Sequence, residues 1–497
     1  MENEKQKIEK KINEGINLFE NNKYEESIKI FEKLKENSKT NIIGIFFLGV
    51  IEVKRKNLKA AKEFFFDVLK INKDHEDANL NLGLVYLEER EFEESLIYFK
   101  RVLTINKRNL NALYHSGLSY FSLRKLDESI RYLNLSIEVN KNFVHSYVTL
   151  GHIYLRIKEF NKALDNYKKV LEIEPSRIRT KFNISWCYFA LSNLKLAFEN
   201  YEFRKEKLFP KGRHKEVLDK FKTSEWNGQN LNDKTILIIC EQGYGDNINF
   251  FRYLFWLQEK YNVKIIFYAH QKLAYLFQGT PFQIISNLED ITHIDYHQHL
   301  LSLPGIYYKE KNGFEKNINY ININQKNNTS WKQKLSTYKK PVIAINWQGD
   351  HRYAYDNMRS IPLYYFKDTL HNKNYKFISL QKNFGIEQIK KNKFEDLLVD
   401  LSSEIDIGKN AFEDTISILK NVECVITSDT AIAHLAGTLN VKTFLLLSFN
   451  PEWRWYIELK HKCFYPNMSI IQQSKFDDWS GVFNELNKKL EKEKKDS

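Results

Sequence analysis

The stretch GLVYLEEREFEESLIYFKRVLTINKRNLNALYHS, residues 83–116, is one copy of a repeat that is 34 residues long. A fixed period of this kind decides the fold of everything inside it. Each copy opens on a glycine or serine, has a small residue twelve positions later, and has an aromatic residue or leucine four positions after that. These positions are Gly15, Ser27, Phe31; Gly49, Ala61, Phe65; Gly83, Ser95, Phe99; Gly117, Ser129, Leu133; Gly151, Ala163, Tyr167; and Ser185, Ala197, Tyr201.

Between these anchors, each copy has the pattern of two amphipathic helices, such as Ala78 to Leu87 and Phe92 to Leu103. Apolar residues recur there at steps of three and four, as one face of a helix requires. The small residues fall where the two helices would cross most closely, and the aromatic residue would fill the groove beside them. The anchors are therefore interpreted as structural rather than functional.

The repeat resembles the tetratricopeptide repeat over six units, from about Ile8 to Arg204, although the usual proline near the end of a unit appears only as Pro175. Such units stack into a superhelix whose concave face holds a peptide or another protein. We therefore predict a repeat array over residues 1–210, with its last unit as a cap. A polar linker is expected over residues 211–232.

Composition narrows the class of protein. Hydrophobic residues are 42% and aromatic residues 14% of the 497, which suits several folded cores and excludes a disordered chain. The net charge of +13 could indicate a polyanionic partner. Lysines usually lie beside glutamates, however, and no basic stretch is interleaved with aromatic residues. We therefore expect no nucleic-acid partner.

The sequence also bears on location. The charged start of the chain leaves no room for the apolar core of a signal peptide. The longest apolar runs, such as Thr443 to Phe449, are far shorter than the ~20 residues of a membrane-spanning helix. The cysteines, Cys187, Cys240, Cys424 and Cys463, are isolated and form no disulfide framework or CxxC site. These features predict a protein of the reducing cytoplasm, without a membrane span.

Beyond Asp233, short β-branched runs alternate with helical segments, as in a doubly wound α/β fold. A first lobe is expected over residues 233–335 and a second over 336–487, with a charged, frayed tail over 488–497. Two such lobes in series would form a cleft between the carboxyl edges of their strands, which is the GT-B architecture. The expected strands are Thr235–Cys240, Val263–Tyr268, Phe282–Ile285, Pro341–Asn346, Phe377–Leu380, Cys424–Thr427 and Thr443–Leu447, and a helix is expected over Asn247–Glu259.

Common cofactor and metal motifs are missing from this part of the sequence. Gly243 and Gly245 begin a glycine-bearing loop, but Ile248 stands where a dinucleotide fingerprint needs its third glycine. There is also no phosphate-binding P-loop, no HExxH and no Asp-x-Asp pair. We therefore expect metal-free chemistry and no cofactor.

Several segments resemble bacterial tetratricopeptide proteins whose C-terminal region is related to the heptosyltransferase-like family 9 glycosyltransferases. The resemblance spans Thr235 to Leu486, and its motifs are specific as a set. They are Glu241-Gln242-Gly243-Tyr244-Gly245-Asp246, Leu301-Ser302-Leu303-Pro304, Arg359-Ser360-Ile361-Pro362, Ser379-Leu380-Gln381, Ser428-Asp429-Thr430-Ala431-Ile432-Ala433-His434-Leu435-Ala436-Gly437 and Pro451-Glu452-Trp453-Arg454-Trp455.

On the acceptor side, the resemblance implies that Asp246 is the general base. A carboxylate at the mouth of a strand-to-helix loop can take the proton of an acceptor hydroxyl as this attacks the anomeric carbon. The alternative is structural, because aspartate at the head of a helix is commonly an N-cap.

On the donor side, the family usually has Asp-Ser/Thr-Gly-x-x-His, and this sequence has Ala431 in place of the glycine. The resemblance places Asp429, Thr430 and His434 in the donor site, where the free N–H groups of a helix start can face a phosphate. His434 could alternatively pack against the sheet. Ala431 narrows the loop and weakens the match.

Arg359 falls where related enzymes have a cation on the donor phosphates, and arginine can bind phosphate through two hydrogen bonds. Its alternative is an exposed arginine beside Asp356. Gln381 and Ser428 are further donor-site candidates. Trp347, Trp453 and Trp455 could stack on a base or sugar, although large aromatic residues usually serve the core.

Together these features predict an inverting, metal-independent glycosyltransferase that uses a nucleotide-activated sugar. The repeats would present a protein acceptor, such as flagellin or another surface protein, by analogy with other enzymes of this layout. One alternative is a surface-polysaccharide transferase. The other is a repeat scaffold whose transferase domain has lost turnover.

Overall fold

The computed structural model describes residues 4–37, 40–207, 212–352 and 356–496. The chain divides into two compact units. The first comprises residues 1–154 and 161–177, and the second comprises residues 155–160 and 178–497. The limit predicted between repeats and linker, residues 210 and 211, lies outside the described residues.

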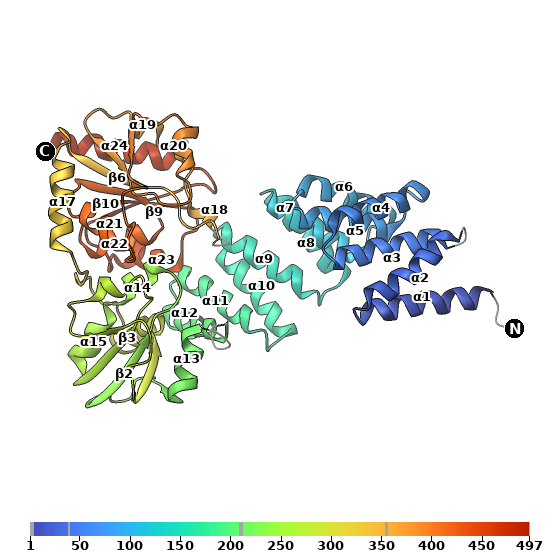
Figure 1. Ribbon diagram of the computed structural model, residues 1–497, viewed down its shortest axis with the longest axis horizontal. Helices are drawn as coiled ribbons and strands as arrows, with labels where there is room; N and C mark the ends of the chain where they lie inside the picture. The colour runs from blue at the N-terminus through green and yellow to red at the C-terminus, as the bar shows by residue number, and fades with distance from the viewer. Residues whose placement is uncertain (1–3, 38–39, 208–211, 353–355, 497) are drawn as a thin grey trace. The chain divides into compact units, whose positions relative to one another are not determined.

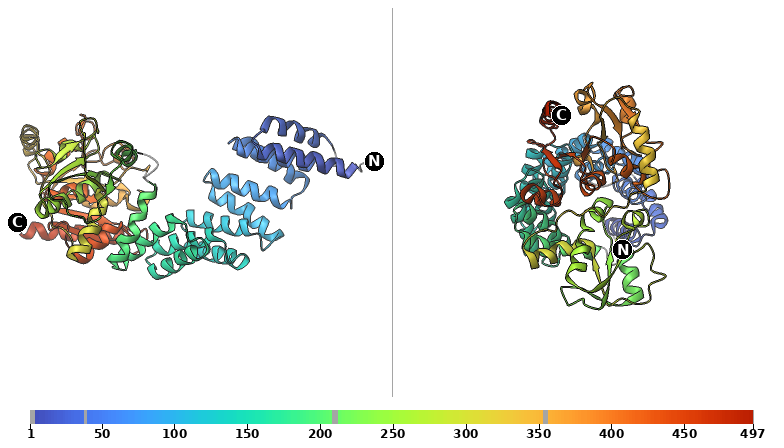
Figure 2. Two further views of the ribbon diagram at one scale, coloured as in Figure 1. Left: turned by 90° about the horizontal axis from the view of Figure 1, so that it is seen from below. Right: turned by 90° about the vertical axis from the view of Figure 1, so that its left-hand side faces the viewer.

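The first unit consists of α-helices in consecutive antiparallel pairs, which stack on one another along the blue-to-teal part of the chain in Figures 1 and 2. The helices are α1 (Glu4–Glu20), α2 (Tyr24–Glu36), α3 (Asn41–Lys54), α4 (Leu58–Ile71), α5 (Glu76–Glu88), α6 (Phe92–Ile105), α7 (Leu110–Ser122), α8 (Leu126–Val139), α9 (Val144–Arg156) and α10 (Phe160–Ile173). The predicted helical solenoid is confirmed.

Each pair is held by the anchors that define the repeat. A Cβ atom on Gly83 would lie 2.4 Å from Cε1 of Phe99, and one on Gly151 would lie 2.4 Å from Cε1 of Tyr167. The ring of the second helix therefore occupies the space left by the missing side chain of the first. Phe99 and Tyr167 are fully buried by this arrangement.

The turn inside each pair also repeats. A residue with positive φ ends the first helix at the same place in every unit: Asn22, Lys56, Arg90, Arg124, Lys158 and Ser192. After Arg90, for example, the N–H of Glu91 reaches back to the carbonyl of Tyr86 at 2.9 Å. This is the Schellman ending, which satisfies a free carbonyl at the end of a helix.

We expect Gly83→Ala to destabilise the repeat array by about 1–3 kcal/mol, because the added methyl overlaps Phe99 in a filled core. Thermal unfolding followed by far-UV circular dichroism measures the effect. Ile97→Ala is the matched control, since the Ile97 side chain is 65% exposed on α6 and its loss should change stability by less than about 0.5 kcal/mol. Equal melting curves for the two variants would contradict this packing.

The second unit opens with the sixth helix pair and continues into the first α/β lobe. Its elements are α11 (Ile178–Ala190), α12 (Leu194–Tyr201), η1 (Glu202–Lys207), α13 (Gly212–Phe221), β1 (Ser224–Glu225), β2 (Lys234–Ile239), α14 (Tyr244–Phe250), α15 (Tyr253–Lys260), β3 (Val263–Tyr268), η2 (Ala274–Phe277), β4 (Gln283–Ile285), β5 (Tyr296–His299), η3 (Leu300–Ser302) and α16 (Leu303–Lys311). The described part of the segment predicted as a linker thus carries α13 and β1.

The sheet of the first lobe is parallel, in the order β1-β5-β2-β3-β4. From β2 the chain builds outward through β3 to β4, and then returns to place β5 on the other side of β2. The loops after β2 and β5 therefore leave in opposite directions. Ligands of open α/β sheets bind at such a switch point, outside the carboxyl ends of the strands.

The second lobe repeats this plan. Its elements are α17 (Gln325–Ser336), β6 (Val342–Asn346), α18 (Asp356–Arg359), η4 (Leu363–Phe366), α19 (Lys367–Leu370), β7 (Lys376–Ser379), α20 (Glu387–Lys391), β8 (Leu398–Asp400), α21 (Glu413–Leu419), β9 (Cys424–Ser428), α22 (Ala431–Thr438), β10 (Thr443–Leu447), α23 (Trp453–His461), β11 (Met468–Gln472) and α24 (Ser480–Asp496). The parallel sheet has the order β11-β10-β9-β6-β7-β8, with its switch point between β6 and β9. The two Rossmann-like lobes are thus confirmed.

The predicted strands appear as β2, β3, β4, β6, β7, β9 and β10, with ends that differ by one residue at most. The predicted helix over 247–259 is wrong in one respect, because it is broken between α14 and α15. There the N–H groups of Leu254 and Phe255 bond three residues back, and Arg252 Nε binds the carbonyl of Asn249 at 2.7 Å. The Arg252 side chain thus takes the place of a backbone N–H as the donor to the Asn249 carbonyl.

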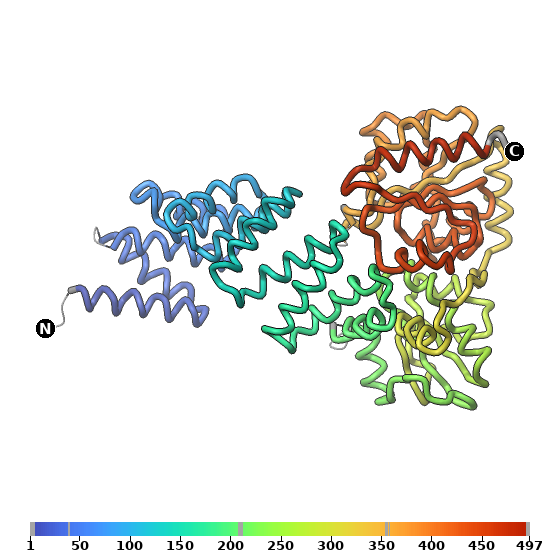
Figure 3. Tube along the Cα trace, turned by 180° about the vertical axis from the view of Figure 1, so that it is seen from behind, coloured from blue at the N-terminus to red at the C-terminus, as the bar shows by residue number. Residues whose placement is uncertain are grey.

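Helix α24 lies along the second lobe in Figure 3 and runs to Asp496, with Leu490 1% exposed. The part of the predicted frayed tail that the structure describes is therefore helical, and its Leu490 packs in the core of the second lobe. Among the helices of the described ranges, none combines the length and the apolar character needed to cross a membrane.

Candidate functional site

The two switch points of the second unit lie against each other. Helix α14 follows β2, helix α22 follows β9, and the starts of these helices are in contact. A Cβ atom on Gly245 would lie 2.6 Å from Cδ2 of His434 and 3.4 Å from Cα of Ala431. The lack of a side chain at Gly245 thus lets the lobes approach closely at the point where the sequence predicts acceptor and donor sites.

Asp246 lies at this junction and is 8% exposed. It is not the N-cap of its helix, because α14 begins at Tyr244 after the N-cap residue Gly243. Asp246 is instead the third residue of the helix, and its Oδ2 accepts the N–H of Gly243 at 3.1 Å. Its Oδ1 pairs with the guanidinium of Arg454. Both carboxylate oxygens are therefore engaged within the protein.

Arg454 comes from α23 in the second lobe and is buried. Burial alone would lower the pKa of this guanidinium, yet the carboxylates of Asp246, Glu452 and Asp429 raise it above its usual value. The Nη1 of Arg454 lies 3.5 Å from Glu452. Its Nε has no hydrogen-bond partner among the described residues. Arg454 is thus a buried cation that links the predicted base to the predicted donor side.

Asp429 directly follows β9 and is 4% exposed. Burial raises the pKa of its carboxyl, while the nearby Arg454 and Arg359 guanidinium groups act in the opposite direction. The next residue, Thr430, is the N-cap of α22, and its Oγ1 donates to Oδ1 of Asn346 at 2.9 Å. Asn346 ends β6, so this bond joins the end of β6 to the start of α22 at the second switch point.

His434 is 3% exposed and packs inside the protein. Its ring stacks on Trp455 with 4.9 Å between centroids, and its Nδ1 lies 2.9 Å from the Tyr465 hydroxyl. Burial holds its pKa well below the usual value, and the surrounding arginines act in the same direction. The structure therefore places a neutral imidazole here, against Gly245 of the other lobe.

Arg359 ends α18, and its side chain is 23% exposed. Its Nε lies 3.1 Å from Oδ1 of Asp356, as its structural alternative requires. Burial would lower its pKa, but Asp429 and Asp356 raise it. A Cβ atom on Gly349 would lie 2.7 Å from its Nη2. Arg359 thus belongs to the same electrostatic group as Asp429, beside the loop that follows β6.

The remaining candidate residues are hydrogen-bonded to or buried among other residues of the protein. The Gln381 amide accepts from Asn346 and from the N–H groups of Trp347 and Gln348, and it donates to the carbonyls of Gln348 and Phe384. Ser428 is fully buried, and within the described residues its hydroxyl has no partner. The three tryptophans considered for stacking are at most 1% exposed and serve the core: Trp347, Trp453 and Trp455.

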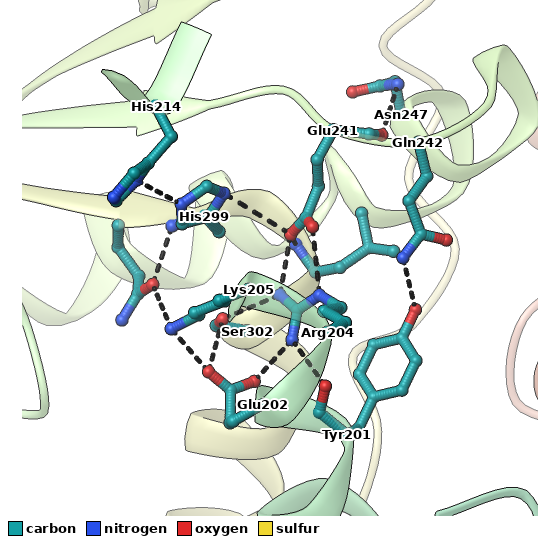
Figure 4. Close-up of polar contacts among 12 residues, drawn as sticks. Tyr201, Glu202, Arg204, Lys205, His214, Glu241, Gln242, Asn247, His299 and Ser302 are labelled. Atoms are coloured by element: carbon teal, nitrogen blue, oxygen red, sulfur yellow. Dashed lines mark hydrogen bonds and ion pairs between the residues drawn. The ribbon is translucent and has the colours of Figure 1, made fainter. Parts of the chain in front are cut away.

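A second polar group was not predicted from the sequence and lies at the first switch point (Figure 4). At its centre, Arg204 binds Glu241 through two hydrogen bonds, from Nε at 2.9 Å and from Nη2 at 2.7 Å. Arg204 also donates to Glu202 at 2.7 Å and to Ser302 at 2.9 Å. The 3₁₀ segment η1 is thereby tied to the loops after β2 and β5.

This second group continues on both sides. Tyr201, at the end of α12, accepts a hydrogen bond from Nε2 of Gln242 at 3.0 Å. On the other side, His299 Nε2 and His214 Nδ1 are 2.8 Å apart, and burial lowers the pKa of both, that of His214 to about 4. The end of the sixth repeat is therefore fixed to the loop that precedes α14, the helix of Asp246.

The charged side chains at the site are carboxylates and guanidinium groups. In the part of the chain that the structure describes, no group of three or more His, Cys, Asp or Glu residues is placed to hold a metal ion. The two arginines of the site can bind an anion, and one carboxylate can accept a proton.

Comparison with known proteins identifies the repeats. The model of the tetratricopeptide repeat matches residues 76–109, 110–143 and 144–177. Protein FlbA of Caulobacter vibrioides is 22% identical over 277 residues, which are 51% of this chain and 46% of that protein. The chain thus spans about half the length of this curated relative.

Among solved structures, PilW, described as a widely conserved type IV pilus biogenesis factor, is 19% identical. Its match covers 43% of this chain and 99% of PilW, with a TM-score of 0.38. YrrB, described as a TPR protein with an unusual peptide-binding site, is 20% identical over 35% of this chain and 91% of YrrB, with a TM-score of 0.32. By the family model, residues 76–177 are tetratricopeptide repeats, and they belong to a helical solenoid that precedes two parallel α/β lobes.

Proposed function

We propose that the chain is an inverting, metal-independent glycosyltransferase of the cytoplasm, which moves a sugar from a nucleotide donor to a hydroxyl of a protein acceptor such as flagellin. One observation carries the proposal. At two facing switch points, the carboxylate of Asp246 at the start of a helix pairs with Arg454, and the neighbouring Asp429 lies close to both Arg454 and Arg359. This transfer needs a group that accepts the proton of the hydroxyl and cations that bind the donor phosphates.

In the proposed reaction, the acceptor oxygen forms a bond to the anomeric carbon while the bond from that carbon to the donor phosphate breaks. The proton of the hydroxyl goes to Asp246, and the electron pair of the breaking bond leaves with the nucleoside diphosphate. Attack from the face opposite to the leaving group inverts the anomeric configuration. The charge of the leaving group faces Arg359 and the start of α22.

In this reaction Arg454 must first release Asp246, because its guanidinium pairs with Oδ1 of that carboxylate. A diphosphate beside α22 would compete with Asp246 for this guanidinium, since charge-assisted bonds to phosphate are strong. Arrival of the donor would then free the carboxylate for the acceptor hydroxyl. Because Gly245 approaches His434 closely, the proposal requires the lobes to move apart when the donor enters.

A second candidate function is a non-catalytic repeat scaffold. It is favoured by the same contact, because both oxygens of Asp246 are engaged and the lobes touch where a donor would lie. Thermal-shift measurements with a panel of nucleotide sugars and nucleoside diphosphates separate the two functions. A ligand at 100 times its Kd should stabilise the transferase by about 2.7 kcal/mol, and absence of any shift across the panel would favour the scaffold.

We expect Arg359→Ala to weaken binding of the nucleoside diphosphate found in that screen about 10- to 100-fold, which corresponds to about 1.5–3 kcal/mol for a lost charged hydrogen bond. Isothermal titration calorimetry measures the Kd. Arg352→Ala is the matched control, because Arg352 is 75% exposed and pairs with Asp350. Equal affinities in both variants would remove Arg359 from the donor site.

A further inference from the structure

A hollow of about 250 Å³ opens on the sixth repeat, between α11 and η1. It belongs entirely to the second compact unit. Its lining residues are Ile178, Arg179, Phe182, Phe203, Arg204 and Glu206. None of them has a part in the reaction proposed above.

The size of the hollow limits what it can hold. Sites for whole small-molecule ligands usually enclose about 300–1,000 Å³. A hollow of about 250 Å³ is thus too small for a nucleotide sugar, but large enough for one side chain. Ile178, Phe182 and Phe203 make its wall apolar, so the side chain that suits it is aliphatic or aromatic.

Three of the four charged residues at the hollow are basic: Arg179, Lys181 and Arg204 are positive and Glu206 is negative, and Arg204 is already paired with Glu241 and Glu202. The charged residues of α11 are Arg179 and Lys181, and this helix has no acidic residue. Arg179 is exposed at the hollow, and Lys181 lies 5.0 Å from the centroid of the Phe203 ring. The ligand that complements this surface carries a carboxylate next to its apolar side chain.

The floor of the hollow is connected to the candidate site. Arg204 lines the hollow, and the same guanidinium is held by Glu241, Glu202 and Ser302 (Figure 4). Glu241 lies five residues before Asp246 on the loop after β2. A ligand in the hollow would therefore contact Arg204, which is fixed to the loop between β2 and the helix of Asp246.

We propose that this hollow is an acceptor subsite, which takes one apolar side chain of the polypeptide acceptor and pairs an adjacent Asp or Glu of that acceptor with Arg179. The inference rests on the proposed function, because the occupant is the protein substrate. It adds a recognition element that belongs to the transferase unit rather than to the first unit of repeats.

Peptide selection on the full-length chain tests the subsite. Random dodecapeptides displayed on phage are selected without any nucleotide sugar, and the enriched peptides are synthesised for affinity measurement. We expect a shared pattern of one aliphatic or aromatic residue with Asp or Glu within about two positions. Phe203→Ala and Arg179→Glu should each weaken binding at least about tenfold, and Arg179→Glu should reverse the preference to Lys or Arg in a new selection.

Lys195→Glu is the matched control, because it reverses an exposed charge on α12 of the same repeat and should leave affinity within about twofold. Arg179 is exposed as well, so Arg179→Glu tests the subsite even if Phe203→Ala fails to fold. Enrichment without this pattern, or equal affinity in all variants, would overturn the subsite. Peptides that bind by this pattern but receive no sugar would count against the transferase alone, whereas transfer that ignores Arg179→Glu would count against the subsite alone.

Discussion

Replacement of Asp246 by asparagine is expected to lower glycosyl transfer about 10²–10⁴-fold, the usual contribution of a general base. Asparagine keeps the size of the side chain, and its oxygen can still accept the N–H of Gly243. It cannot take up the proton of the acceptor hydroxyl. Transfer is measured as sugar incorporated into the acceptor under single-turnover conditions, so that product release does not hide the chemical step.

The same substitution also changes stability, because it removes one of the two carboxylates that pair with Arg454 and leaves Glu452 at 3.5 Å. Breaking a buried ion pair costs about 3–5 kcal/mol when the remaining charge is uncompensated, and Glu452 should offset part of that cost here. A companion variant, Asp246→Asn with Arg454→Met, removes both charges and should recover part of this loss. Arg454→Met alone gives the contribution of the arginine and completes a double-mutant cycle.

The cycle separates the two roles of Asp246. If it is the base, the double variant folds but transfers sugar as slowly as Asp246→Asn. If it is only the partner of Arg454, the folded Asp246→Asn variant keeps most of its transfer, and the double variant transfers sugar at the rate of Arg454→Met alone. A stable double variant that transfers at the wild-type rate would eliminate Asp246 as the base.

Glu241→Ala is expected to destabilise the second unit by about 3–5 kcal/mol, because it breaks the buried pair with Arg204. The side chains of Arg204 and Glu241 are each 3% exposed. Replacing both, by Arg204→Met with Glu241→Leu, should recover most of the loss, since apolar residues of similar volume can substitute for a buried ion pair.

Urea unfolding followed by tryptophan fluorescence measures these effects selectively. All eight tryptophans of the chain lie in the second unit, from Trp186 to Trp479. Asp219→Ala is the matched control, because its pair with Lys215 is 63% and 53% exposed and such surface pairs contribute about 0–1 kcal/mol. If Glu241→Ala is as stable as Asp219→Ala, the sixth repeat is not anchored through this pair.

The parts of the fold that follow from periodicity were predictable. The glycine and aromatic positions of the repeat describe local contacts within one helix pair, as Gly83 and Phe99 illustrate. Strands β2 and β10 contain the continuous apolar runs Ile236–Ile239 and Phe444–Leu447, which is the pattern of a parallel strand buried on both faces. In both cases, residues near one another in the sequence carry the information.

Strand β5 was not predictable in this way. It reads Tyr296-His297-Gln298-His299, and its three polar residues are at most 2% exposed. They are buried because remote residues satisfy them: His299 meets His214, and Gln298 Nε2 donates to the carbonyl of Trp226 at 2.6 Å. No local pattern contains these partners.

The candidate site was predictable in part. The resemblance pointed to Asp246, Arg359 and Asp429, which the structure brings together. Arg454 stood in a quoted motif without a role, because its pairing with Asp246 bridges 208 positions of sequence. The position of Asp246 within α14 depends on where the helix starts, and such boundaries are the least certain part of a sequence pattern.

The most direct test of the central claim is the mass of captured acceptor proteins after incubation with nucleotide sugars. Wild-type chain and the Asp246→Asn, Arg454→Met double variant are each loaded with proteins that they retain from a cell extract, and are then given the same panel of donors. We expect one donor to add a sugar residue to a serine or threonine of a captured protein, with wild-type chain only. Unchanged masses with every donor, or equal addition by both chains, would contradict it.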